Sequence, residues 1–138
     1  MKLNALLLYF LLAVSICACK DDEPEEAPSL PEYSITINSP NGAEITAGES
    51  LHIHVDFDEP NGLTVHHVNV QLTTDIGEVL YDGPSVAHVH TDGGHYELHD
   101  DVDINVEPGT ELTLTAKVWG HTAGTAEQTT TASFVAVQ

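Results

Sequence analysis

Apolar and polar residues alternate in short segments from Tyr33 to Gln138, and Gly, Pro and Asn separate the segments. Successive side chains of a strand point to opposite faces, so a period of two predicts strands with one buried face. No window keeps the 3.6-residue apolar period of a helix, and we expect no helix longer than one turn. Strands are predicted at residues 33–39, 50–57, 64–73, 79–81, 86–91, from 95 onward, 111–119 and 127–137.

The segment at residues 50–57 has the clearest alternation. Its apolar residues would face a core, and its polar residues would point outward. Seven or eight strands with this spacing in residues 33–138 favour an all-β, two-sheet sandwich with Greek-key connections. The outward residues of the segment are His52, His54 and Asp56.

One corner of the chain carries a family resemblance. Residues 106–112, VEPGTEL, resemble the corner that enters strand F of fibronectin type III and bacterial immunoglobulin-like domains, with Leu112 where those domains usually have tyrosine. The resemblance implies an immunoglobulin-like sandwich and a role in binding or spacing, without any particular chemistry. It also implies that the strand at residues 50–57 lies beside the strand that begins at His95.

The N-terminal residues have a different composition. Lys2 precedes the apolar run Leu3–Ile16, which is shorter than the roughly 20 residues of a membrane span and is typical of a secretory signal. The sequence Ile-Cys-Ala-Cys that ends at Cys19 resembles the cleavage site of bacterial lipoproteins. The resemblance implies that residues 1–18 are removed and that Cys19 is lipidated.

The residues after Cys19 are acidic and rich in proline. Lys20–Glu23 resembles the export tag of Bacteroidota-type surface lipoproteins, which implies an outer-membrane protein that faces the cell exterior, the periplasmic face being the alternative. The prolines prevent helix or sheet from propagating, so residues 19–32 are expected to form a lipidated, disordered tether. One domain, residues 33–138, follows.

The charge of the chain restricts its partners. Three lysines, with no arginine, stand against 22 acidic residues, and the formal net charge is −19. Such a surface repels phosphate groups and concentrates cations. We therefore expect no nucleic-acid partner and a membrane contact through the lipid alone, while a protein or glycan partner stays open.

All nine histidines lie in the predicted domain. Asp92-Gly93 is a two-residue hairpin signal, and a turn centred there would pair His90 with His95. Three imidazoles and a carboxylate would then share the outer face of one hairpin and could bind a metal ion. The predicted ligands are His88, His90 and His95, with Glu97 as the fourth or supporting group and His99, His52 and His54 as auxiliary residues.

The domain lacks sulfur ligands, because Met1, Cys17 and Cys19 are all N-terminal. Imidazole and carboxylate ligands favour Zn²⁺, Cu²⁺ or Ni²⁺ over Cu⁺, and we expect Zn²⁺ or Cu²⁺. His66 and His67 are consecutive, so we expect them to point to opposite faces, and we expect His121 to be a loop residue.

Two other kinds of ligand are consistent with the residues. The run from Asp100 to Asp103 has carboxylates that suit Ca²⁺, although Asp100 has the parity of the buried residues and a bulge there is the simpler interpretation. Trp119 and Tyr81 could form an aromatic platform for a carbohydrate.

The chain has none of the motifs that mark a nucleophile elbow, a phosphate-binding loop or a zinc-protease helix. We therefore expect a binding module and not an enzyme. The function favoured by the sequence is a lipid-anchored cell-surface module that captures a divalent transition metal, Zn²⁺ or Cu²⁺, on a histidine-rich sheet face. The alternatives are an adhesive or structural spacer domain with no small ligand, and a carbohydrate-binding module.

Overall fold

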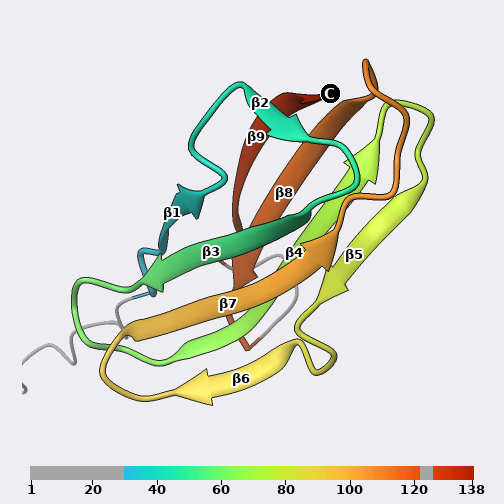
Figure 1. Cartoon of the computed structure of the whole chain (residues 1–138). Coiled ribbons are helices and arrows are strands. Elements are labelled where there is room, and N and C mark those ends of the chain that lie inside the picture. The colour runs from blue at the N-terminus through green and yellow to red at the C-terminus, as the bar shows by residue number, and fades with distance from the viewer. Residues whose placement is uncertain (1–29, 122–125) are drawn as a thin grey trace, which may run out of the picture.

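The computed structural model describes residues 30–121 and 126–138, which form nine strands in two facing sheets (Figure 1). The predicted all-β sandwich is confirmed, with nine strands instead of seven or eight. This part of the chain contains no helix that could cross a membrane. The predicted signal peptide at residues 1–18, the lipidated Cys19 and the tether up to Ser29 lie outside the described residues.

The smaller sheet has three antiparallel strands in the order β1-β3-β7. Strand β3 lies between the other two, and its pairing with β7 is the adjacency that the resemblance to immunoglobulin-like domains implied. The bounds are β1 Ser34–Ser39, β3 Ser50–Asp58 and β7 His95–Asp103.

The larger sheet has six strands, in the order β2-β9-β8-β4-β5, with β6 paired to the first part of β4. Strand β2 runs parallel to β9, and the other pairs are antiparallel. The bounds are β2 Glu44–Thr46, β4 Val65–Thr74, β5 Val79–Gly83, β6 His88–Thr91, β8 Glu111–Trp119 and β9 Gln128–Val137.

The core lies between the sheets and is made by the apolar residues of the alternating segments. Ile53, Val55 and Phe57 of β3 are fully buried against residues of β4 and β8 such as Val70 and Leu114. The inward orientation predicted for these segments is confirmed. The intervening polar residues of β3 consequently point away from the core, onto the outer surface of the smaller sheet.

The prediction that β6 and β7 form a hairpin, with His90 opposite His95, is wrong. The turn at Asp92 and Gly93 carries the chain from one sheet to the other: β6 pairs with β4, with His67 opposite His88, and β7 pairs with β3. The physical reason is length, because β7 pairs with β3 over nine residues and buries Leu98 and Val102, whereas β6 has only four residues to offer.

The crossing is held by a contact between two loops. Gly94 has φ +74°, and its carbonyl accepts a hydrogen bond from the Glu59 N–H at 2.7 Å. A Cβ atom at Gly94 would collide with the backbone oxygen of Glu59. Only glycine combines this backbone conformation with so close an approach.

Glu59 is itself a buried carboxylate that the sequence analysis did not identify. It accepts hydrogen bonds from the backbone N–H of Leu63 at 2.7 Å and of Glu32 at 3.2 Å, and from the Asn61 side chain at 3.1 Å. Burial alone would raise the pKa of Glu59, but these hydrogen bonds outweigh it and the pKa is lowered. The carboxylate therefore organises the loop onto which Gly94 docks.

Two smaller expectations also fail. The pairing of β3 with β7 is continuous, so no bulge occurs at Asp100, which is exposed on this edge strand although Leu98 and Val102 of the same parity are buried. Strand β2 was not predicted, since three residues are too few to show an alternation.

We predict that Gly94→Ala destabilises the fold more than Gly93→Ala does. Gly93 has φ +91° and nothing near the position of an added Cβ, so its substitution costs only the left-handed conformation, about 1–2 kcal/mol. Gly94→Ala adds the collision with Glu59, worth about 1–3 kcal/mol more. Urea denaturation measures both losses, and equal losses would show that the loop contact is unimportant.

Candidate functional site

The structure divides the histidines into two groups on different sheets. His52, His54, His95 and His99 lie on the outer surface of β3 and β7, whereas His88 and His90 lie with three other histidines beside β4. The seven predicted metal ligands are therefore not brought together. We call the first group, with its carboxylates, the acidic histidine face, and it consists of His52, His54, Asp56, Asp58, His95, Glu97, His99 and Asp101.

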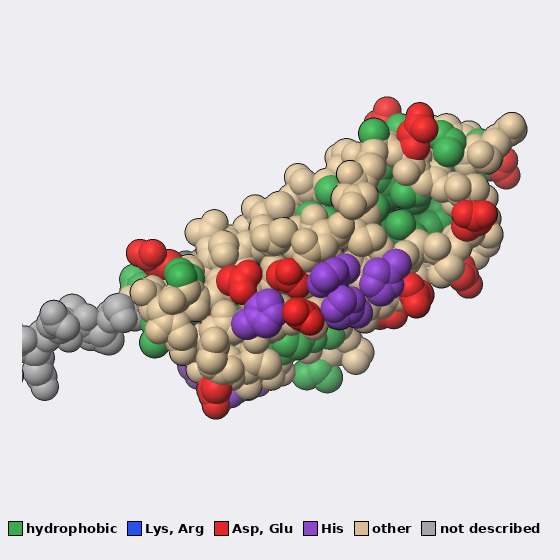
Figure 2. Space-filling model, turned by 60° about the vertical axis from the view of Figure 1, so that its left-hand side comes forward, with side chains coloured by type: hydrophobic (Ala, Val, Ile, Leu, Met, Phe, Trp, Pro, Cys, Tyr) green, Lys and Arg blue, Asp and Glu red, His purple; other side chains and the backbone are tan. Residues whose placement is uncertain are grey.

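On the acidic histidine face, imidazoles and carboxylates adjoin in one band (Figure 2). The register of β3 and β7 places His52 opposite Asp101 and Asp58 opposite His95. The nitrogen to oxygen distances of these two pairs are 2.8 and 2.7 Å. Directly opposed residues have Cβ atoms about 4.5–5.5 Å apart, which is why such pairs form.

The same register places two carboxylates, Asp56 and Glu97, opposite each other. Like charges in that position destabilise a sheet unless a cation lies between or beside them. His95 Nε2 lies 3.0 Å from Glu97, and single ligand atoms of Asp56, His95 and Glu97 all lie within 4.8 Å of one another. Among the described residues no other group meets this criterion, and the trio could hold a divalent ion.

Hydrogen bonds orient the members of this trio from outside it. The Asn38 side chain donates to Asp56 Oδ2 at 2.7 Å, and Asp58 lies against His95 Nδ1. The ring of His54 stacks on that of His99, with centroids 4.0 Å apart. The face is therefore an ordered array, and sequence parity alone predicted its outward histidines.

The contact between His95 and Glu97 shifts the pKa values of both residues. Hydrogen bonds to Glu97 and then to Asp58 raise the pKa of His95, and the hydrogen bond from His95 lowers the pKa of Glu97. Since the folded pKa of His95 is raised, its ion pairs stabilise the fold fully below the unfolded value of about 6.5. That contribution is lost as the pH rises through the folded pKa.

The second group, which we call the histidine cluster, consists of His66, His67, His88, His90 and His121. The ring of His66 lies 4.9 Å from that of His90 and 5.0 Å from that of His121, and the ring of His67 lies 4.7 Å from that of His88. The expectation that His121 is a loop residue is confirmed. The sequence missed the cluster because it depends on the pairing of β6 with β4.

The expectation that His66 and His67 point to opposite faces is wrong. Val65 and Val68 are both fully buried although they are three residues apart, so the alternation is broken between them. The pairing with β6 shifts register at this point, and His90 has the left-handed φ of +49°. The irregularity brings the rings of His66 and His67 to 5.9 Å.

The imidazoles of the histidine cluster have other histidines as neighbours, and this changes the pKa of two of them. Burial lowers the pKa of His66 and of His88, and the adjacent histidines lower both further. A lowered pKa gives the opposite linkage to that of His95: the stabilising contribution is present above about 6.5 and is lost as the pH falls through the folded pKa. The Nδ1 atoms of His66 and His67 are buried without a hydrogen-bond partner in the described part of the chain.

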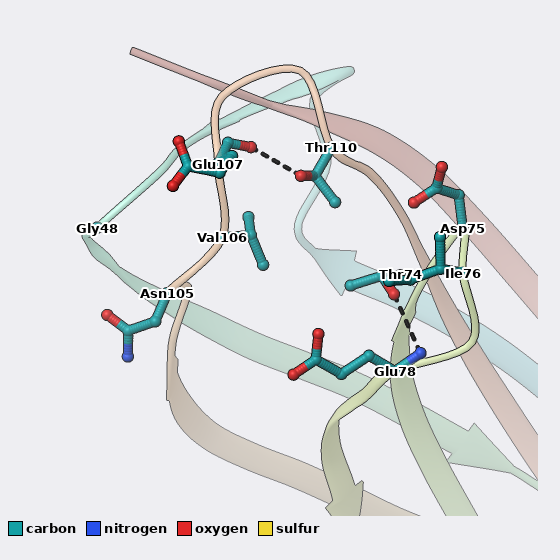
Figure 3. Close-up of a pocket in the computed structure, with 9 residues that line it drawn as sticks. All are labelled: Gly48, Thr74, Asp75, Ile76, Glu78, Asn105, Val106, Glu107 and Thr110. Atoms are coloured by element: carbon teal, nitrogen blue, oxygen red, sulfur yellow. Dashed lines mark hydrogen bonds between the residues drawn. The ribbon is translucent and has the colours of Figure 1, made fainter.

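A hollow of about 650 Å³ lies among the loops beyond β2, β4 and β7 (Figure 3). The carboxylates of Asp75, Glu78 and Glu107 stand around it without converging on one point. Two of its polar contacts are internal, from the Glu78 N–H to Thr74 Oγ1 and from Thr110 Oγ1 to the Glu107 carbonyl. It contains none of the predicted ligands.

The aromatic platform suggested by Trp119 and Tyr81 is not formed. Trp119 pairs with His67, and Tyr81 pairs with Leu72. These two positions of β4 are five residues apart, so the two aromatic residues are separated by roughly 16 Å along the strand. His67 stacks on Trp119, with centroids 5.2 Å apart, and Lys117 Nζ lies 5.4 Å from the indole centroid.

Comparison with known proteins does not place the chain in a family: no family model matches it, and no curated protein is detectably similar to it.

We predict that His95 of the acidic histidine face titrates on one side of the ordinary histidine pKa, and His66 and His88 of the histidine cluster on the other. His95 should titrate above about 6.5 because its carboxylate partners favour the imidazolium, and His66 and His88 should titrate below it because burial disfavours the charged ring. NMR titration of the imidazole C–H signals of the metal-free protein measures each midpoint. A His95 midpoint below that of His66 would contradict the assignment.

Proposed function

We propose that this protein is a lipid-anchored binding module of the outer membrane that captures Zn²⁺ on the acidic histidine face. The observation that carries the proposal is the convergence of ligand atoms from Asp56, His95 and Glu97 within 4.8 Å. Zinc is bound by imidazole nitrogen and carboxylate oxygen, and sites with three protein ligands complete a tetrahedron with water.

The surroundings of the trio support a metal site. A metal-ligating histidine commonly donates its other ring N–H to a carboxylate, which fixes the tautomer and the ring orientation. Asp58 is placed to accept that hydrogen bond from His95 Nδ1, which leaves Nε2 for the ion. The Asn38 side chain donates a hydrogen bond to Asp56 Oδ2 and so orients this carboxylate.

Exposure of the trio favours capture over catalysis. The side chains of His95 and Glu97 are 47% and 52% exposed, so an ion can arrive from and leave to solvent directly. The strongly acidic surface raises the local concentration of cations. A flat, exposed site lacks the water-excluding cleft that hydrolysis usually requires.

The location rests on the sequence. Lipidation at Cys19 and an acidic tether would hold the domain at the membrane surface, with the acidic histidine face accessible to ions outside the cell or in the periplasm.

We expect Glu97→Gln to weaken Zn²⁺ binding by about 10–100-fold, because it removes one ligand of the trio and the partner of His95. Isothermal titration calorimetry of the full chain measures the affinity, and a His88→Asn, His90→Asn background keeps the histidine cluster out of the measurement.

The matched control for the zinc experiment is Asp103→Asn. It removes one charge from the same face of the same strand, but Asp103 pairs with Ser50, at the far end of β3 from Asp56. Its affinity should stay within about twofold of the parent. Equal losses in the two variants would mean that overall charge, and not the trio, binds the ion.

We expect Cys19→Ser to release the protein from the membrane fraction, because the serine cannot carry the thioether-linked lipid and the acidic domain has no attraction of its own for anionic lipid. Fractionation of cells and immunoblotting test this. Retention of the variant in membranes would overturn the anchor and leave zinc binding to be judged on the calorimetry alone.

A further inference from the structure

We propose that the histidine cluster is a second transition-metal site, separate from the acidic histidine face, which binds Cu²⁺ through imidazole alone. His66, His88 and His90 are the ligands, and His121 is the nearest further imidazole. The site comes from different strands and a different sheet, so it does not depend on the zinc proposal.

The spacing of the three rings fits coordination to one ion. Their centroids form a triangle with sides of 4.9, 5.6 and 5.7 Å. Nitrogen binds such ions at about 2.0–2.1 Å, which puts bound ring centroids about 3.2 Å from the ion and roughly 4.5–5.2 Å from each other at bond angles of about 90–110°. Each ring centroid therefore needs to shift by less than about 1 Å, in addition to the rotation that points a ring nitrogen at the ion.

The side chains of His66, His88 and His90 have room to make the movement that coordination requires. The nitrogens converge less closely than the ligand atoms of the Asp56 trio, so the rings have to turn before an ion is bound. The side chains of His88 and His90 are exposed, so a change of rotamer meets little steric hindrance on their solvent side. A hollow of about 310 Å³ lies beside His66 and His121 and gives these two rings space.

Within the described part of the chain, the imidazoles of the cluster form no hydrogen bond that would compete with a metal ion. On the other face each histidine contacts a carboxylate, whereas no carboxylate of the described residues is hydrogen bonded to any member of the cluster. His66 Nδ1 is buried and unpartnered, an arrangement that costs free energy unless something binds there. An ion could coordinate His66 Nδ1 directly. Alternatively, coordination through the other ring nitrogen would turn the ring and expose Nδ1 to a hydrogen bond from water.

His67 positions the cluster without joining the triangle. Its ring is stacked between Trp119, at 5.2 Å, and His88, at 4.7 Å, and is half-buried. The indole fixes His67, and His67 in turn supports the His88 ring from one side. The left-handed backbone at His90 turns its side chain back toward His66.

The donor set selects the metal. Divalent first-row ions bind nitrogen sites with affinities that rise to Cu²⁺, which also accepts a planar arrangement of three or four nitrogens. Carboxylates suit harder ions, and none within the described ranges 30–121 and 126–138 forms an ion pair with a histidine of the cluster. The two sites therefore differ in chemistry: one mixes oxygen with nitrogen, and the other offers nitrogen only.

The experiment uses the full chain with the acidic histidine face disabled by Asp56→Asn, His95→Asn and Glu97→Gln. Cu²⁺ is added alone and followed by competition titration and by electron paramagnetic resonance. We expect one Cu²⁺ per chain, with hyperfine splitting from about three imidazole nitrogens. Adding His88→Asn and His90→Asn should weaken binding by about 100-fold or more, because it removes two ligands. Asparagine is chosen because it tolerates the left-handed φ of His90.

The matched control adds His52→Asn and His99→Asn instead, which removes the same number of histidines from the other face and should change the affinity by no more than about twofold. Thermal unfolding without metal checks that both variants keep the fold. Absence of stoichiometric binding in the parent of this series, equal losses in the two variants, or a spectrum without nitrogen splitting would each overturn the second site. None of these outcomes bears on zinc binding by the Asp56 trio.

Discussion

The pairing of β7 with β3 over nine residues determines which polar side chains meet in this molecule. It places the outward residues of the two strands in fixed cross-strand pairs, and it takes β7 away from the strand that precedes it in sequence. The docking of Gly94 on Glu59 holds the chain at the point where it changes sheets. The separation of the histidines into two groups results from the pairing of β7 with β3, which leaves β6 to pair with β4.

Local alternation was sufficient to predict which face of β3 is buried. The inward set of β3 and the outward set that includes His52 and His54 follow from a period of two, and β8 begins and ends at the predicted residues. These predictions succeed because burial of one face is a local property, visible in the residues of a single strand.

Partners of strands were harder to predict from sequence. The Asp92-Gly93 turn signal is real, but a turn specifies a bend and not the sheet to which the following strand belongs. The histidine cluster also required the broken alternation between Val65 and Val68, and no residue type in that segment signals it. Only the family arrangement, and not spacing, indicated that β3 and β7 lie side by side. The two groups consequently present different chemistry: in one, carboxylates hold imidazoles in salt bridges, and in the other, imidazole rings lie against each other and against the Trp119 indole.

Strand β7 is an edge strand, and among the described strands none pairs with its other side. Its exposed residues include Glu97, Asp100, Asp101 and Asp103, with no lysine or arginine on the strand. An open edge with so many charges of one sign repels the same edge of a second copy, which prevents backbone pairing between neighbours. Neighbouring copies can therefore come close together without pairing through their β7 edges.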